Sequence, residues 1–214
     1  MDDIRSYYGT VHLILASASP RRAELLRSAG YTFDVVVTDV DESIAPGESP
    51  SIYVRRLAAD KSAAAQSSVV SGAGRGSEGP PERGHDQQVI LGADTTVVVD
   101  GEILGKPRDD EDARHMLRRL SGNTHQVMTG VSLRQGAFEV GRVETSLVVF
   151  RALTDEDISW YVASGEGRDK AGGYAIQGLA SRFIPSISGS YSNVVGLPVA
   201  AVDELMRSLL ASGR

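Results

Sequence analysis

A short apolar segment that leads directly into a helix constrains the fold of this 214-residue chain more than any other feature. Residues 11–16 (VHLILA) predict a buried strand, and the polar residues 17–20 (SASP) follow at once. Ser19 suits the N-cap of a helix, Pro20 its first position and Gly30 its C-terminal end. The segment therefore predicts a strand, a tight turn and a helix, the repeating unit of α/β proteins.

Strand-like and helical patterns alternate along the rest of the chain, with no internal repeat. Ser49-Pro50 marks the start of a helix, and Asp100-Gly101 marks a hairpin turn. Residues 92–95 (GADT) are expected to separate two strands. Further strands are predicted at residues 33–38, 89–91, 96–99, 126–134 and 140–151, and further helices from residue 49, at 109–120, at 154–163 and at 197–210. This mixture predicts an α/β fold with a mixed sheet.

Residues 67–88 interrupt this alternation. Glycine, serine, proline and charged residues dominate the segment, and its apolar residues follow no period. Such a composition is typical of a flexible surface insertion. The segments on either side still read as one α/β unit, so residues 1–214 are predicted to form a single domain.

Composition and charge exclude several classes of function. The chain contains no cysteine, so disulfides, thiol catalysis and zinc-thiolate sites are excluded, and a reducing cytoplasm is the expected location. No run of about 18 apolar residues is present, and residues 1–10 lack the basic and apolar regions of a signal peptide, so no membrane segment is expected. The net charge of −6 argues against binding to a nucleic acid polymer, which usually requires a basic surface.

The start of the first helix is a candidate phosphate site. A helix N-terminus presents unpaired N–H groups and a partial positive charge. The hydroxyls of Ser17 and Ser19 and the guanidinium groups of Arg21 and Arg22 lie at this end, and arginine matches the geometry of phosphate oxygens. An ordinary helix cap followed by solvated arginines explains the same residues equally well.

Carboxylates and lysines elsewhere in the chain could complete such a site. Asp94 is expected near the carboxyl end of an apolar strand, where ligands meet open α/β sheets, and Glu42 follows another predicted strand. Carboxylates, together with waters and substrate phosphates, are the usual ligands of Mg²⁺. Lys61 and Lys106 could point toward the same cleft. Taken singly, a turn-forming aspartate and surface lysines are the simpler explanations.

Residues 169–178 (DKAGGYAIQG) form the last candidate segment. Glycine allows the backbone to approach a ligand closely, and the amide of Gln177 can both donate to and accept from the edge of a base. A structural glycine loop is the alternative interpretation. The four histidines show no metal-binding spacing and are given no role, whereas Trp160 and Tyr161 are expected in the core.

Each of these segments is a weak indication alone, but their joint order is specific. From about Leu13 to about Leu205 the chain closely resembles the Maf (septum-formation protein) family. Seven separated motifs occur in the family's order: LASASPRR, DE, RLAADKS, LGADT, GKPRDDEDARHMLRRLSGNTHQVMTG, DKAGGYAIQG and GSYSNVVGLP.

The resemblance implies an α/β fold of the Maf/inosine-triphosphatase-like type, with a mixed sheet in two lobes around a deep cleft, and a homodimer. The implied activity is hydrolysis of a nucleoside triphosphate to a monophosphate and pyrophosphate with Mg²⁺ or Mn²⁺. Asp94 matches the family's proton acceptor, and Glu42 and Asp94 match its metal ligands. Positions matching phosphate-binding residues are Ser17, Arg21, Arg22, Lys61 and Lys106, and positions matching base-selecting residues are Arg21, Thr95 and Gln177.

The IQG wording at residues 176–178 resembles the branch of the family that acts on dTTP and UTP. Two alternatives stay open. One is a pyrophosphatase for 7-methyl-GTP or another modified nucleotide, the substrate type of a different branch. The other is a nucleotide-binding regulator of septum formation that acts through a cell-division partner. The dense set of acids and bases favours catalysis, because pure binding would not require Asp94.

Overall fold

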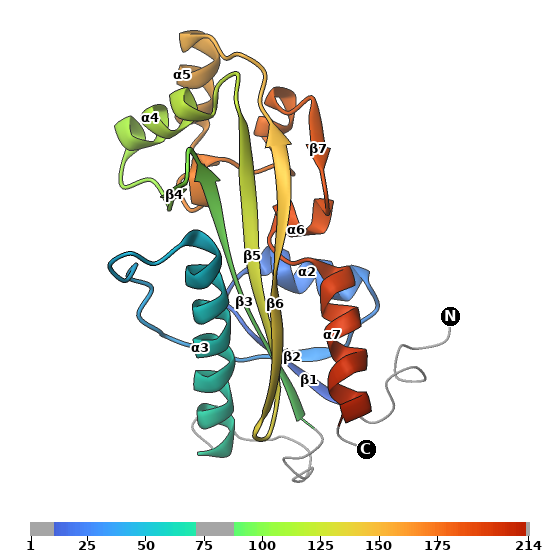
Figure 1. Cartoon of the computed structure of the whole chain (residues 1–214). Coiled ribbons are helices and arrows are strands. Elements are labelled where there is room, and N and C mark those ends of the chain that lie inside the picture. The colour runs from blue at the N-terminus through green and yellow to red at the C-terminus, as the bar shows by residue number, and fades with distance from the viewer. Residues whose placement is uncertain (1–10, 72–87, 213–214) are drawn as a thin grey trace.

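One seven-stranded mixed sheet organises the molecule, whose computed structural model describes residues 11–71 and 88–212 (Figure 1). The strands are β1 (His12–Ala16), β2 (Phe33–Val35), β3 (Gln88–Val99), β4 (Glu102–Leu104), β5 (Thr124–Gln135), β6 (Phe138–Val149) and β7 (Ser186–Ser188). Their order is β2-β1-β3-β5-β6-β7, and β4 pairs with β3. Strand β1 runs parallel to β2 and β3, whereas the remaining pairs are antiparallel. The predicted α/β fold with a mixed sheet is confirmed.

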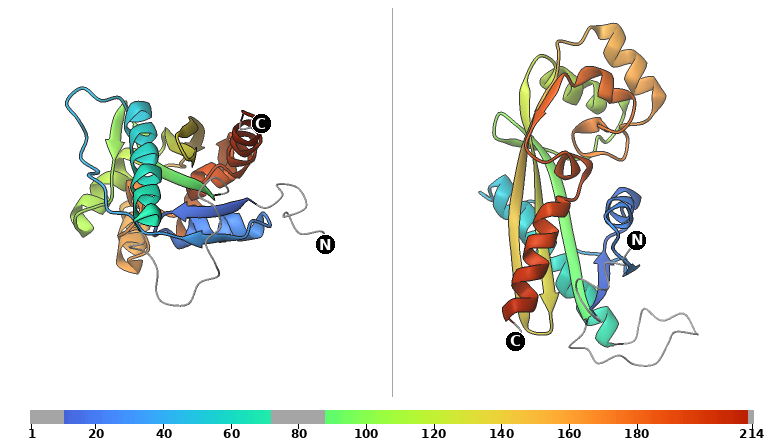
Figure 2. Two further views of the ribbon diagram at one scale, coloured as in Figure 1. Left: turned by 90° about the horizontal axis from the view of Figure 1, so that it is seen from below. Right: turned by 90° about the vertical axis from the view of Figure 1, so that its right-hand side faces the viewer.

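Helices cover both faces of this sheet. They are α2 (Pro20–Ser28), α3 (Pro50–Val70), α4 (Asp110–Leu120), α5 (Asp155–Ser164), α6 (Tyr191–Val195) and α7 (Val199–Ser212). Figure 2 places α3 and α7 on opposite faces of the long β5–β6 hairpin. Local sequence explains several helix ends, since Thr154 and Asp157 form a capping box at α5 and Gly30 follows α2 with a φ of +86°. Within the described residues, no helix has the length and apolar character needed to cross a bilayer.

The two larger of three hydrophobic clusters among the described residues mark two lobes of the sheet. The upper lobe of Figure 1 packs α4 and α5 against residues such as Val97 and Val148. The lower lobe packs α2 and α7 against residues such as Leu15 and Val131. Strands β3 and β5 contribute to both cores, so each lobe holds one half of the same long strands. The predicted division into two lobes follows from this shared sheet.

Two glycines let α3 cross the sheet with backbone against backbone. A Cβ atom at Gly92 of β3 would lie 2.1 Å from the carbonyl oxygen of Ala58, and one at Gly130 of β5 would lie 2.0 Å from that of Val54. Real Cβ atoms do not approach so closely, so any larger residue would push the helix away. The close crossing fixes which residues of α3 face the middle of β3.

Strand β3 differs from the sequence prediction because it runs without a break through residues 92–95. Asp94 pairs with Gly130 and Thr95 with Thr129, so β5 hydrogen-bonds the segment that was expected to turn. Gly92 serves the close helix crossing and not a turn. Asp94 therefore lies in the middle of a 12-residue strand and not at its end.

Other boundaries also moved. The predicted strand at 33–38 ends at Val35, although the N–H of Val36 still donates to Leu15 of β1. Helix α3 continues to Val70 and β3 begins at Gln88, so both ends of the expected insertion at 67–88 belong to regular elements. The rest of that insertion, residues 72–87, lies outside the described residues.

The aromatic pair on α5 divides between core and surface. Tyr161 is buried as expected, whereas the expectation for Trp160 is wrong, because 42% of this residue is exposed. The inward face of α5 carries Ile158, Tyr161 and Val162, which follow helical spacing and leave Trp160 outside. The guanidinium of Arg182 covers the Trp160 ring at 4.8 Å.

A buried histidine lies in the core of the upper lobe. His125 is 1% exposed, and its Nε2 lies 2.7 Å from the hydroxyl of Tyr174. Its ring meets that of Phe150 edge-on at 5.2 Å between centroids. Burial lowers the pKa of His125 to about 4, because the apolar surroundings disfavour the charged form.

We expect replacement of Gly92 by alanine to destabilise the protein by about 2 kcal/mol or more, because the new methyl group overlaps the α3 backbone. Urea unfolding would measure the change. Gly105→Ala is the matched control, since nothing lies within 4 Å of a Cβ there, and it should alter stability by less than about 0.5 kcal/mol. A Gly92→Ala protein with an unchanged midpoint would contradict the close crossing.

Acid should destabilise the protein partly through His125. In the unfolded chain His125 is protonated below about pH 6.5, whereas in the folded chain it is protonated only below about pH 4. The free energy of unfolding therefore falls as pH falls through this window. Between pH 7 and pH 5, wild type should lose about 2 kcal/mol more unfolding free energy than His125→Gln. The exposed His115, changed to Gln, serves as the control and should follow wild type. Equal losses in wild type and His125→Gln would show that His125 is not held neutral.

Candidate active site

One cleft of about 600 Å³ opens between the two lobes, next to the carboxyl end of β1. Strand β1 stops at Ala16, opposite Gly92, and β4 pairs with β3 from Val97, so the edge of β3 between these partners is open to the cleft. The structure brings every residue predicted for the site into the lining. These are Ser17, Arg21, Arg22, Glu42, Lys61, Asp94, Thr95, Lys106 and Gln177.

The first wall of the cleft is the turn from β1 into α2. Ser19 takes the backbone conformation of an N-cap, but its side chain makes no capping hydrogen bond. The hydroxyl of Ser17 instead accepts hydrogen bonds from the N–H of Ser19 at 3.2 Å and from the Arg22 guanidinium at 3.0 Å. Because residues 18–21 also line the cleft, the positive end of the α2 dipole faces into it.

The two arginines of α2 have different surroundings. Arg22 is buried and donates from Nε to the carbonyl of Gly196 at 2.8 Å and from Nη2 to Thr95 Oγ1 at 3.0 Å. Burial lowers its pKa, and the nearby charge of Asp94 opposes this effect. The Nε of Arg21 is buried without a hydrogen-bond partner among the described residues. Arg22 therefore braces the cleft, and Arg21 is the arginine of this wall whose side chain is not engaged in that brace.

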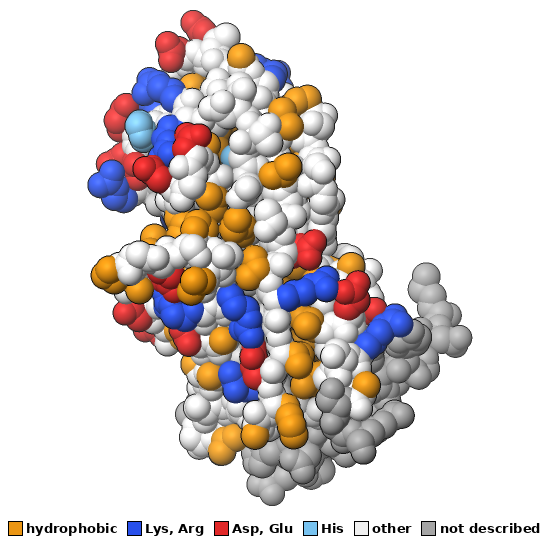
Figure 3. All heavy atoms as spheres, viewed as in Figure 1, with side chains coloured by type: hydrophobic (Ala, Val, Ile, Leu, Met, Phe, Trp, Pro, Cys, Tyr) orange, Lys and Arg blue, Asp and Glu red, His pale blue; other side chains and the backbone are white. Residues whose placement is uncertain are grey.

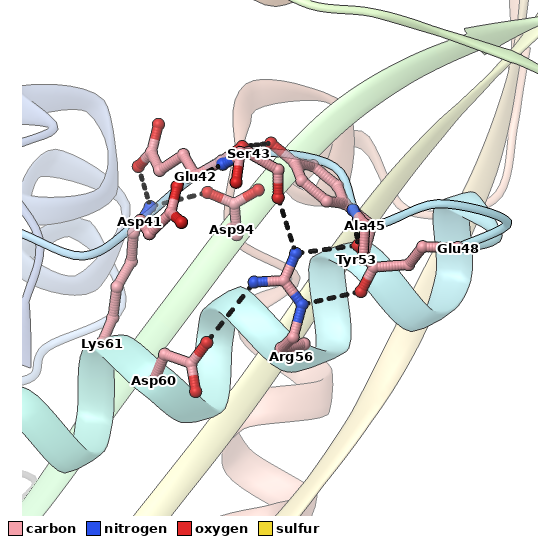
Figure 4. Close-up of polar contacts among 10 residues, drawn as sticks. All are labelled: Asp41, Glu42, Ser43, Ala45, Glu48, Tyr53, Arg56, Asp60, Lys61 and Asp94. Atoms are coloured by element: carbon pink, nitrogen blue, oxygen red, sulfur yellow. Dashed lines mark hydrogen bonds and ion pairs between the residues drawn. The ribbon is translucent and has the colours of Figure 1, made fainter.

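Two carboxylates meet one ammonium group in another part of the cleft lining (Figure 4). Lys61 Nζ of α3 lies 2.7 Å from Glu42 Oε1 and 2.7 Å from Asp94 Oδ1. The Asp94 side chain is only 12% exposed, whereas that of Glu42 is 54% exposed. Burial works to raise the pKa of Glu42, but the hydrogen bond and charge of Lys61 lower it overall, with help from Lys106 and Arg22. Glu42 is therefore ionised at neutral pH.

Glu42 and Asp94 could together bind a cation whose remaining coordination positions are filled by a ligand. Both groups converge on a cation, here the Lys61 ammonium. Mg²⁺ commonly takes one or two carboxylates and completes its shell with waters and substrate oxygens. Among residues 11–71 and 88–212, no group of three or more acidic or histidine side chains could enclose a metal. Glu42 and Asp94 thus fit a divalent cation that also binds phosphate oxygens, and not a metal caged by the protein alone.

The remaining wall comes from the upper lobe. Lys106 follows β4, and Gln177 lies between two short 3₁₀ turns, Ala171–Gly173 and Leu179–Phe183. A hydrogen bond from the N–H of Gly172 to the carbonyl of Gly105, at 2.9 Å, joins these loops. Thr95 faces the lower lobe instead, where its hydroxyl donates to the carbonyl of Gly196 at 3.1 Å.

Sequence reasoning missed Tyr53, which also lines the cleft. Its hydroxyl donates to the backbone carbonyl of Glu42 at 3.0 Å. Burial raises the pKa of Tyr53 to about 12, and the charges of Asp94 and Glu42 add to the effect, so the hydroxyl stays a donor. The available signal was its spacing, since Tyr53 lies eight residues before Lys61, about 80° around the helix, and so falls within the same broad stripe. Asp169 and Lys170 line the cleft as well and were given no role.

A family model described as Maf-like protein matches residues 12–209, and every lining residue discussed above lies inside this range. The chain belongs to the Maf family.

Several curated Maf relatives are similar over nearly their whole length. A protein of Anaeromyxobacter dehalogenans is 48% identical over 199 residues, which cover 91% of this chain and 92% of that protein. Proteins of Shigella dysenteriae and Vibrio cholerae are 48% and 47% identical, covering 93% and 91% of this chain and 93% and 96% of their own. All three carry the name dTTP/UTP pyrophosphatase.

Among solved structures, the Ham1 protein of Staphylococcus aureus is a far more distant match. It is 12% identical, with a TM-score of 0.37 over 67% of this chain and 72% of that chain, which is too weak to bear on the fold.

Proposed function

We propose that this protein hydrolyses dTTP and UTP to the nucleoside monophosphate and pyrophosphate. One observation carries the proposal: a cleft between two lobes holds two converging carboxylates on one wall and an arginine-rich helix N-terminus on another. Relatives at 47–48% identity that bear the name dTTP/UTP pyrophosphatase support the same substrates.

The cleft suits a polyphosphate in spite of the net charge of −6. Arg21 and the N–H groups at the start of α2 would bind phosphate oxygens, with Ser17 and Arg22 fixing their geometry. Lys106 adds a positive charge from the upper lobe. Outside the cleft, acidic and basic side chains are interspersed over the face shown in Figure 3. Because the positive charges of Arg21, Arg22 and Lys106 lie together in the cleft, the protein suits a small anionic ligand better than a nucleic acid polymer.

The proposed reaction is attack of water on the α-phosphorus. The new P–O bond forms as the bond to the bridging oxygen breaks, and pyrophosphate leaves. Asp94 would accept the proton of the attacking water, because its carboxylate is nearly enclosed and faces the cleft. Lys61 holds that carboxylate in place, and the same ammonium group also pairs with Glu42. A divalent cation, Mg²⁺ or Mn²⁺, held by Glu42 and Asp94 would supply charge neutralisation and Lewis acidity when bound.

Base selection is assigned to Arg21, Thr95 and Gln177. The Gln177 amide has both a donor and an acceptor, which matches the edge of a pyrimidine. Its presence in the lining of the cleft together with Thr95 and Arg21 supports this role. A pyrophosphatase for 7-methyl-GTP or another modified nucleotide would share the phosphate chemistry and differ at these residues.

We further propose that residues 1–214 form one domain that works in the cytoplasm as a homodimer. The long strands that serve both cores support a single folding unit, and nucleoside triphosphates are abundant in the cytoplasm. Light scattering on the purified protein would measure the oligomeric state.

A substrate screen tests the proposed activity. Purified protein would be incubated with common and modified nucleoside triphosphates and Mg²⁺ or Mn²⁺, and pyrophosphate would be scored separately from phosphate. We expect pyrophosphate from dTTP and UTP, lost on addition of a chelator. Release from a modified purine instead would overturn the base assignment, and no release from any nucleotide would overturn the enzyme assignment.

Asp94→Asn should lower kcat by roughly 10²–10⁴-fold and leave nucleotide binding within about threefold of wild type, because the amide cannot accept the proton of the attacking water. Steady-state kinetics and calorimetric titration with nucleotide would measure both quantities. Asp100→Asn makes the same chemical change in an exposed turn outside the cleft and should keep wild-type kinetics. A division phenotype in cells that survives Asp94→Asn would favour the regulator acting through a cell-division partner.

A further inference from the structure

The segment that carries Glu42 has no core of its own. Residues 37–48, here the Glu42 segment, connect β2 to α3 without helix or strand, and none of them is buried as a whole residue. Even its apolar side chains face outward, since Val37 is 66% and Ile44 is 51% exposed. Hydrophobic burial therefore cannot fix its conformation. Polar contacts with α3 must do so if Glu42 is to meet Lys61 and Asp94.

Arg56 makes most of these contacts (Figure 4). Its Nε and Nη2 donate to the two carboxylate oxygens of Glu48 at 2.7 and 2.8 Å, and Nη2 also donates to the carbonyl of Ser43 at 3.0 Å. The Glu48 side chain is only 4% exposed and accepts the N–H of Ala45 at 3.0 Å. The Arg56 hydrogen bonds lower the pKa of Glu48 to about 2. Such two-point charged pairs are the strong ones among hydrogen bonds.

A second contact follows immediately along the segment. Tyr53 donates to the carbonyl of Glu42, and Arg56 donates to that of Ser43, so α3 holds two consecutive carbonyls from residues three apart. One further turn along, Lys61 holds the Glu42 carboxylate itself. Helix α3 is in turn fixed on the sheet at Gly92 and Gly130.

We propose that Arg56 is a positioning residue that clamps the Glu42 segment onto α3 and so presents the Glu42 carboxylate beside Asp94. Arg56 is not among the residues that line the cleft, so it acts through Glu42 and does not touch the substrate. The consequence for catalysis rests on the proposed function, whereas the clamp itself is a property of the fold.

The neighbouring Arg55 provides a matched control. Its side chain is 29% exposed against 32% for Arg56, and its Nη2 contacts both carboxylate oxygens of Glu139 at 2.7 and 2.8 Å. Its partner lies on β6 and not on the Glu42 segment. Loss of Arg55 removes a similar ion pair from the same helix without releasing the clamp.

Hydrogen exchange followed by mass spectrometry tests the clamp without any assay of activity. In Arg56→Gln we expect the amides of Ser43, Ala45 and Glu48, whose N–H groups are hydrogen-bonded within residues 37–48, to exchange at least roughly fivefold faster than in wild type, because local opening becomes more frequent. Arg55→Gln should leave this segment unchanged. Tyr53→Phe and Glu48→Gln each remove one anchor and should give intermediate rates, which keeps the test decisive if Arg56→Gln folds poorly.

The Mn²⁺ concentration for half-maximal pyrophosphate release tests the consequence. Arg56→Gln should raise it roughly tenfold while kcat at saturating Mn²⁺ stays within about threefold of wild type, since a carboxylate presented for a fraction of the time binds correspondingly more weakly. Arg56→Lys restores charge but not the two-point contact and should recover only part of the loss. Arg55→Gln should keep the wild-type midpoint.

Two results would overturn the proposal. One is unchanged exchange across residues 37–48 in Arg56→Gln, and the other is an equal change in Arg55→Gln, which would point to general loss of stability. If wild type releases no pyrophosphate, the proposed function fails, and the exchange experiment alone still decides whether Arg56 forms the clamp.

Discussion

The acidic wall of the cleft depends on how closely α3 lies on β3 and β5. Two residues without side chains, Gly92 and Gly130, remove the usual spacing between a helix and a sheet. Lys61 can therefore reach Asp94 from a helix 33 residues away in sequence, at a distance of 2.7 Å. A backbone-to-backbone contact has few soft degrees of freedom, so α3 acts as a rigid frame. The Glu42 segment, which contains no helix or strand, gains its geometry from this frame by hydrogen bonds.

Much of the fold followed from local sequence. The strand, turn and helix at residues 11–30, the capped α5 and the β5–β6 hairpin all carry their own signals, and the structure confirms them. The predictions were wrong where a contact with a residue distant in sequence determines the position of a side chain or the backbone. Gly92 looks like a turn residue, but it makes room for α3, and Trp160 looks like a core residue, but Arg182 covers it at the surface. Hydrophobic periodicity describes one helix or strand at a time, so it predicts neither the contact of Gly92 with α3 nor that of Trp160 with Arg182.

For the site, the sequence predicted side chains that share one cleft but not the main-chain contacts that hold them. Individual motifs were ambiguous, and only their joint order suggested that residues from Ser17 to Gln177 share one cleft, as the structure shows. Tyr53 and Arg56 were missed because each donates to a backbone carbonyl, which every residue carries, and because the Glu48 partner of Arg56 lies in an irregular segment whose path the sequence does not predict. The brace made by Arg22 was hidden for the same reason, since its partner is the carbonyl of Gly196. Side-chain chemistry could be read from residue types, but contacts to the main chain required coordinates.

The bond between Arg22 and Gly196 joins positions 174 residues apart, and Thr95 shares the same carbonyl. Leu197 and Val202, just beyond it, complete the core that β1 and α2 begin. On the ribosome, the start of α2 and strand β3 emerge long before Gly196, whose carbonyl accepts the hydrogen bond of Arg22. A nascent chain therefore carries an unfinished site for most of its synthesis. Nucleotide can meet the braced cleft only after nearly the whole matched region has left the exit tunnel.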